Sequence, residues 1–359
     1  MDRMFLEISN VSKTFPGVKA LQNVHFDIYP GEVHALVGEN GAGKSTLIKI
    51  LSGVYQPDEG ALIKIDGKET VINNAIDAIK KGISVIYQDF SLFKNLTVAE
   101  NIGINGMIEQ DKKIVDWKAI NKKAKDALDF LKADIDLSSI VENLSVAKQQ
   151  MVAIASAVAE DAKMIIMDEP TSALSKQEVL HLYDIIDSLK AKGIAIMFVS
   201  HKMDELFKVA DRFTVLRDGQ YVKTVKKTEV CENQLISMMV GRKVEIKQYA
   251  NLEKKGEVIL KLENLSKKGN FKNINLEVKA GEVVGLTGLV GAGRSELAQA
   301  VFGISKPDSG KIYVSGKEVH IKNPAEALKV GISYIPESRQ TQGLVSVSYT
   351  HLRAHETGA

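Results

Sequence analysis

Short runs of apolar residues recur along the first two thirds of the chain. Each run is typical of a strand that is buried on both faces. Segments with helical periodicity separate these runs, and such alternation predicts an α/β fold whose parallel sheet is covered on both faces. The strand runs are 33–37, 83–87, 164–167 and 194–199, and the helical segments are about 46–51, 75–81, 97–160 and 176–191.

Two further patterns refine this prediction. Residues 4–10 and 24–29 alternate apolar and polar side chains, as half-buried strands do. Ser175, with Glu178 three residues later, predicts a capping box at the start of the last helix named above. Within the long helical region, we interpret Trp117 as a packing residue.

Composition excludes several classes of protein. The 359 residues suffice for roughly two domains. A net charge of +2 is far below the strong positive charge typical of a nucleic-acid-binding protein, so no nucleic-acid partner is expected. The single cysteine, Cys231, rules out internal disulfides and cysteine zinc clusters, and we interpret it as a packing residue. No apolar run reaches the length of a membrane span, which predicts a soluble protein that would act at a membrane through a partner.

The segment 38–46 matches the phosphate-binding pattern G-x-x-x-x-G-K-[ST], between a predicted strand and a predicted helix. Its glycines allow the backbone to curl so that amide groups point at phosphate, and the helix N-terminus adds partial positive charge. Lys44 would reach the β- and γ-phosphates, and the Ser45 hydroxyl would bind Mg²⁺. The candidate nucleotide-binding residues here are Gly38, Asn40, Gly41, Gly43, Lys44, Ser45 and Thr46.

Polar side chains also follow the other predicted strands, where α/β sheets present their chemistry. Asp168 would hold Mg²⁺ through water, and Glu169 would act as general base toward the attacking water. Gln88 would touch Mg²⁺ or that water. His201 would sense the γ-phosphate, its alternative being a purely structural histidine. Together these residues predict nucleotide hydrolysis with Mg²⁺.

An internal repeat indicates a tandem duplication. Gly31-Glu32-Val33 recurs 250 positions later as Gly281-Glu282-Val283. We therefore expect a first domain at 1–241, a linker at 242–257 and a partial second domain at 258–345. The second domain contains its own glycine loop, with candidate nucleotide-binding residues Gly288, Gly293, Arg294 and Ser295.

The segment 144–149, Leu-Ser-Val-Ala-Lys-Gln, lies between the phosphate-binding loop (P-loop) at 38–46 and the acidic pair Asp168 and Glu169. With the other motifs in this order, the chain resembles the ATPase domain of ABC transporters. The resemblance implies a P-loop NTPase fold with a mixed sheet and a helical subdomain at about 97–160. It also implies that Ser145 and Gln149 contact nucleotide held by the P-loop of the opposite domain. Phe15 would stack on adenine, its alternative being a packing aromatic.

The segments 15–21, 38–40 and 96–101, with the degenerate second P-loop, narrow the resemblance to the bacterial monosaccharide-import ATPases. This implies a peripheral subunit at the cytoplasmic face of the membrane. Its partners would be membrane permease subunits docked on the helical subdomain, a sugar-binding protein indirectly, and a second ATPase domain in cis or in trans. The alternatives are a nucleoside importer of the same layout, a soluble ABC ATPase acting on ribosomes or DNA, and a nucleotide-binding fragment without turnover.

Three departures from the family pattern qualify these expectations. Arg294 replaces the P-loop lysine, so we expect the second site to bind nucleotide differently and to hydrolyse it poorly. Ala147 stands where the family has glycine, and its methyl group would crowd a phosphate. Residues 346–359 do not resemble the sequence that follows in the family. We therefore expect a truncated second domain followed by an artefactual or disordered tail, which leaves hydrolysis by this chain open.

Overall fold

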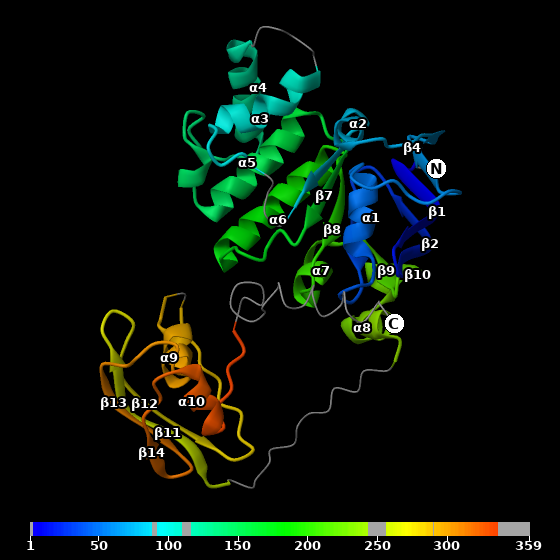
Figure 1. The fold of residues 1–359 in the computed structure, drawn as a ribbon. Helices are drawn as coiled ribbons and strands as arrows, with labels where there is room; N and C mark the ends of the chain where they lie inside the picture. The colour runs from blue at the N-terminus through cyan, green and yellow to red at the C-terminus, as the bar shows by residue number, and fades with distance from the viewer. Residues whose placement is uncertain (1–2, 88–91, 110–115, 243–255, 290, 337–359) are drawn as a thin grey trace. The chain divides into compact units, whose positions relative to one another are not determined.

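The computed structural model describes residues 3–87, 92–109, 116–242, 256–289 and 291–336. It divides into two compact units, Met1–Glu245 and Ile246–Ala359. Figure 1 labels the helices and strands of both units.

The first unit contains a ten-stranded sheet in the order β5-β4-β1-β2-β10-β9-β3-β8-β7-β6. The half from β9 to the edge strand β6 is parallel, and within it β3 is hydrogen-bonded to β8 on one side and to β9 on the other. The predicted apolar runs all form strands in this parallel part. The parallel strands are β3 (Val33–Val37), β6 (Ile83–Ile86), β7 (Met164–Asp168), β8 (Ala195–Val199) and β9 (Arg212–Arg217).

The rest of the sheet is largely antiparallel, so the sheet is mixed, as the family resemblance implied. The two predicted half-buried strands form the antiparallel hairpin of β1 and β2. Strand β10 lies between β2 and β9, although β2 and β9 are nearly two hundred residues apart in sequence. The remaining strands are β1 (Leu6–Phe15), β2 (Val18–Ile28), β4 (Leu62–Ile65), β5 (Lys68–Glu69) and β10 (Gln220–Lys226).

Helices cover both faces of this sheet, and α3, α4 and α5 pack on one another within the predicted helical region (Figure 1). None of the helices in the described ranges is long and apolar enough to cross a membrane. The first unit's helices are α1 (Lys44–Leu51), α2 (Ala75–Lys80), α3 (Val98–Glu109), α4 (Trp117–Phe130), α5 (Val146–Ala159), α6 (Lys176–Ala191), α7 (Met203–Val209) and α8 (Glu232–Val240), with short 3₁₀ turns at Val141–Asn143 and Lys227–Glu229.

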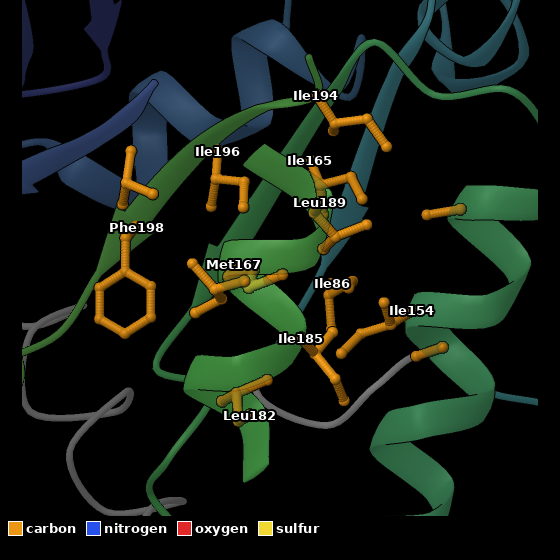
Figure 2. Close-up of a cluster of buried hydrophobic side chains, with 14 of the residues drawn as sticks. Ile86, Ile154, Ile165, Met167, Leu182, Ile185, Leu189, Ile194, Ile196 and Phe198 are labelled. Carbon is orange, nitrogen blue, oxygen red and sulfur yellow. The ribbon is translucent and has the colours of Figure 1, made fainter. Parts of the chain in front are cut away.

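Alternate side chains of the central strands serve two separate cores. On β8, Ile196 and Phe198 belong to the cluster that also contains Leu189 of α6. Their neighbours Ala195 and Met197 belong to the cluster on the opposite face. Figure 2 shows the first of these clusters, where side chains of β7 and β8 meet those of α6 and α5. Apolar burial on both faces fixes the strands whose carboxyl ends carry the candidate site.

Two expectations about single residues were wrong. Trp117 is half exposed, because it lies at the first residue of α4, before the stretch that buries Ala124 and Leu128. Cys231 is exposed, because it precedes α8 as its N-cap and does not enter the core.

The second unit contains a four-stranded antiparallel sheet in the order β12-β11-β13-β14. The first unit has β2-β1-β4-β5 in the corresponding order. A small core of Leu262, Leu265, Leu297, Val301 and Ile312 holds this sheet against a helix. The elements are β11 (Val258–Lys267), β12 (Phe271–Lys279), β13 (Ser309–Val314), β14 (Lys317–Val319), α9 (Arg294–Val301) and α10 (Pro324–Lys329).

One segment of the second unit differs sharply from its counterpart in the first. Residues 282–289 form no strand, and Val283 is 97% exposed. Its counterpart in the repeat, Val33, is fully buried in β3 between two neighbouring strands.

Candidate functional site

The glycine loop connects β3 directly to α1, as the sequence predicts. Gly41 and Gly43 have φ angles of 86° and 96°, in the left-handed region that favours glycine. A methyl group at Gly43 would lie 2.5 Å from Leu21 Cδ2, and one at Gly38 would lie 2.4 Å from the Leu216 carbonyl oxygen. At Gly41 it would meet no atom within 4 Å. Close packing therefore requires two of the glycines, and the third borders open space.

Lys44 is the first residue of α1. Its Nζ donates to the carbonyl oxygens of Gly38, at 2.7 Å, and of Glu39, at 3.0 Å. Burial lowers the pKa of the Lys44 ammonium group, while Glu169 and Asp168 act to raise it. The lysine thus lies across its own loop, near two carboxylates from the end of β7, the strand beyond β8 in the sheet.

The acidic pair lies at the end of β7. Burial raises the pKa of the Asp168 carboxyl and the Glu169 charge raises it further, while Lys44 acts against both. Glu169 follows with a φ of 51°, which is unusual for a residue with a side chain. Its backbone N–H donates to the Val199 carbonyl at 2.9 Å, which ties it to the end of β8.

Glu169 and His201 are in direct contact. Imidazole Nδ1 lies 2.8 Å from Glu169 Oε2, and the two side chains are 64% and 27% exposed, the histidine being the more accessible. The carboxyl ends of β3, β7 and β8 therefore carry Lys44, the acidic pair and His201 respectively. Gln88, the other candidate at a strand end, lies outside the described residues.

This arrangement fits a magnesium-bound nucleoside triphosphate. The open space beside Gly41 leaves room for the phosphate. The backbone amides at the start of α1 and the Lys44 ammonium are donors for phosphate oxygens. Ser45 is exposed beside them, and a hydroxyl with one carboxylate is a hard oxygen donor set of the kind Mg²⁺ uses together with substrate phosphates. In the described part of the chain, no three His, Cys, Asp or Glu side chains form a metal cluster.

Residues 21–172 and 271–355 match the sequence profile of the ABC transporter family. This chain belongs to the ABC transporter family. It is 45% identical over 338 residues to a putative ribose/galactose/methyl galactoside import ATP-binding protein of Hahella chejuensis, and 46% identical over 335 residues to a ribose import ATP-binding protein of Roseobacter denitrificans. The alignments cover 94% and 93% of this chain, but only 65% of each relative's length.

Solved structures agree with the family. One is the dimeric, post-hydrolysis state of an ATP-binding cassette bound to ADP and inorganic phosphate. It is 26% identical, with a TM-score of 0.54, and the match covers 62% of this chain and 98% of that one. The mixed sheet and the P-loop fold are therefore those of an ABC cassette.

The family's aromatic position, Phe15, lies at the end of β1. Its ring packs edge-on against Tyr55, with centroids 5.3 Å apart, and Lys13 Nζ lies 5.6 Å from the ring centroid. Phe15 is half-buried. An adenine ring placed here would meet two aromatic side chains, of which the sequence analysis found only one.

The segment 144–149, which carries the resemblance to the family, leads into α5. Ser145 is the N-cap, and its Oγ accepts from the Lys148 backbone N–H at 3.4 Å. Gln149 Nε2 donates to the carbonyl oxygens of Val141 and Leu144, at 3.2 and 3.0 Å. None of the described hydrogen bonds of Ser145 or Gln149 reaches Lys44 of the first P-loop. Thr46, by contrast, lies in α1, two residues after Lys44.

The second glycine loop keeps the local form of the first. Gly293 has a φ of 83° and is the N-cap of α9, and a methyl group there would lie 2.4 Å from the Asn270 carbonyl oxygen. Arg294 takes the place of Lys44 as the first residue of the helix and is exposed, as is Ser295. Gly288, at the start of this loop, would place a methyl group 3.1 Å from Ala292 Cβ.

Sequence reasoning missed a group of buried polar residues beside the candidate site. Glu205, on α7, binds Thr171 and Ser200. A glutamate in the first turn of a helix is an ordinary feature, so the pattern gave no signal that this one is buried.

Proposed function

We propose that the protein of which this chain is at least a part binds and hydrolyses ATP to energise the import of a sugar through a membrane permease. The observation that carries the proposal is the meeting of Lys44, Asp168, Glu169 and His201 at neighbouring strand ends. The names of the relatives at 45–46% identity support sugar as the imported solute.

In this proposal, the loop amides and Lys44 hold the β- and γ-phosphates, which requires Lys44 to release the carbonyls of Gly38 and Glu39. Ser45, Gln88 and, through water, Asp168 would hold Mg²⁺, and the ion would supply positive charge for the phosphate oxygens. Glu169 accepts a proton from the attacking water. His201 fixes the Glu169 carboxylate through its Nδ1 and faces the γ-phosphate.

The partners follow from the same proposal. Ser145 and Gln149 would act on nucleotide at the P-loop of a second ATPase domain, in cis or in trans. The segment 144–149, in which the Ala147 methyl group would crowd a phosphate, would then face the second glycine loop, which carries Arg294. The permease would dock on the helical region 97–160 at the cytoplasmic face of a bacterial membrane, and a sugar-binding protein would deliver the solute to the permease.

Uptake of labelled ribose tests the function, in a bacterium that lacks its own ribose import ATP-binding protein and expresses this chain. We expect the chain to restore uptake and Glu169→Gln to abolish it. In the purified protein, phosphate release should fall by about 10²–10⁴-fold in Glu169→Gln, with ATP affinity kept. Glu59→Gln, in an exposed turn, is the matched control.

Three results would contradict parts of the proposal. Full turnover by Glu169→Gln would remove the general base. Uptake of a labelled nucleoside in place of ribose would assign the chain to the nucleoside-importing branch. ATP binding by the wild type without any phosphate release would favour a nucleotide-binding role without turnover.

A further inference from the structure

A buried carboxylate lies behind the candidate site without belonging to it. Glu205 is the third residue of α7 and only 5% exposed. A buried carboxylate is costly unless hydrogen bonds or opposite charges compensate it. Glu205 Oε2 accepts from Thr171 Oγ1 and, at 3.0 Å, from Ser200 Oγ, while Oε1 lies 2.9 Å from Lys202 Nζ. Both of its oxygens are therefore bound.

The two hydroxyl donors come from the loops that carry the candidate catalytic pair. Thr171 lies two residues after Glu169, and Ser200 lies immediately before His201. Both donors are at least nine-tenths buried, at 2% and 6% exposure. A single oxygen, Glu205 Oε2, thus joins the loop after β7 to the loop after β8.

The geometry of the pair depends on how these two loops lie relative to one another. Glu169 has a φ of 51°, a conformation that persists only where surrounding contacts hold it. His201 is largely exposed, so the described contacts fix its ring mainly through Glu169. The carboxylate of Glu205 is the buried group that both loops share.

From this arrangement we propose that Glu205 is a positioning residue, which sets the distance between the Glu169 carboxylate and the His201 imidazole by holding Thr171 and Ser200. Its hydrogen bonds in the described part of the chain go to Thr171, Ser200 and Lys202, so it acts through these residues and is not a catalytic residue. The effect on rate rests on the hydrolysis proposed above, whereas the effect on the Glu169–His201 contact does not.

Thr171→Val removes the hydrogen bond from Thr171 to Glu205 with little change in volume. Ser200→Ala removes the bond from Ser200, together with the one that Ser200 Oγ accepts from the Lys202 backbone N–H at 3.1 Å. Glu205→Gln changes the shared group itself. Thr214→Val is the matched control. Thr214 is also fully buried, and its Oγ1 is hydrogen-bonded to His34 and Thr224 in the interior of the sheet.

The first readout is the NMR signal of the His201 ring in the histidine-labelled chain of 359 residues, assigned with His201→Gln. We expect the ring signal to shift in Thr171→Val, Ser200→Ala and Glu205→Gln and to stay unchanged in Thr214→Val. The second readout is turnover, where kcat should fall about tenfold to a hundredfold while ATP affinity stays within about twofold, because small displacements of a catalytic group cost rate and not binding.

The outcomes separate positioning from general stability and from the proposed hydrolysis. An unchanged His201 signal in Thr171→Val and Ser200→Ala would overturn the proposal, even if Glu205→Gln failed to fold. A shift of equal size in Thr214→Val would also overturn it, since any buried hydroxyl would then have the same effect. If the wild type released no phosphate, the hydrolytic function would fail, and the NMR comparison alone would still decide the positioning role.

Discussion

A second buried polar group lies inside the sheet, on the strand that leads to the P-loop. His34 is fully buried on β3, and its Nε2 lies 2.8 Å from Thr214 Oγ1 of β9. Burial, and the nearby Arg212 charge, lower the pKa of the His34 imidazole to about 3. The ring is therefore neutral at physiological pH, and the 3.5 Å approach of its Nδ1 to Glu32 Oε1 is not an ion pair.

This buried histidine predicts a pH dependence of stability. Its pKa is lower in the folded protein than the usual 6.5, so the unfolded chain binds more protons between those two values and stability falls as the pH falls through that range. Between pH 7 and pH 5, His34 should cost about 2 kcal/mol of unfolding free energy. Urea unfolding of the wild type and of His34→Leu at both pH values measures the difference.

Glu32 acts in the opposite direction, because burial raises the pKa of its carboxyl. The wild-type slope is therefore a sum, and the comparison with His34→Leu isolates the histidine. His25→Leu, at an exposed position on β2, is the control because it removes a histidine and leaves His34 in place. Equal slopes in wild type and His34→Leu would contradict the prediction.

Among the helices, α6 is the one whose start is best defined by its own sequence. Ser175 N donates to Glu178 Oε2 at 2.7 Å, and Glu178 N lies 3.5 Å from Ser175 Oγ, which completes a capping box. The helix then runs from Lys176 to Ala191, as predicted. The hydrogen bond from Ser175 lowers the pKa of the Glu178 carboxyl, so its contribution is present above the usual 4.5 and is lost as the pH falls below it.

Removal of this cap should destabilise the first unit. We expect Ser175→Ala to lower the free energy of unfolding at pH 7 by about 1 kcal/mol, because the Glu178 backbone N–H in the first turn loses its partner. Ser188→Ala, within the same helix at an exposed position, should be neutral or slightly stabilising, since alanine favours helix. If both variants lost the same stability in urea unfolding, the cap would contribute nothing of its own.

The capping box, the P-loop and the strand that ends in Asp168 could be predicted from the sequence, because each depends on residues a few positions apart. The place of β10 between β2 and β9 could not, since it depends on pairing between distant segments. For the same reason the pattern gave no warning that Glu205 is buried or that Tyr55 lies beside Phe15. The candidate site was predicted as residue types at strand ends, and the structure adds the Glu169–His201 contact.

At the scale of the whole molecule, the first unit contains both of the cores that hold its sheet. The second unit has its own smaller core. Among the residues of the second unit that the structure describes, none belongs to either large cluster. The sheet that carries Lys44, Glu169 and His201 should therefore be stable by itself.

A chain of residues 1–245 tests this independence. We expect it to unfold cooperatively and to bind ATP within about twofold of the affinity of the full chain, because all the described groups of the first site lie within it. Thermal unfolding followed by circular dichroism, with and without nucleotide, measures both properties. A non-cooperative transition would mean that the second unit contributes to the first unit's stability.

The position of β3 in the sheet has a consequence for synthesis of the chain. Both neighbours of β3 come much later in sequence, since β8 ends at Val199 and β9 at Arg217. At ordinary translation speeds, roughly 10–35 s pass between the synthesis of Val33–Val37 and that of residue 217. Without flanking strands a valine such as Val283 is almost fully in water, and the nascent P-loop strand is in the same position. The phosphate-binding loop is thus made early and ordered late, and an apolar strand next to it is available to chaperones throughout that interval.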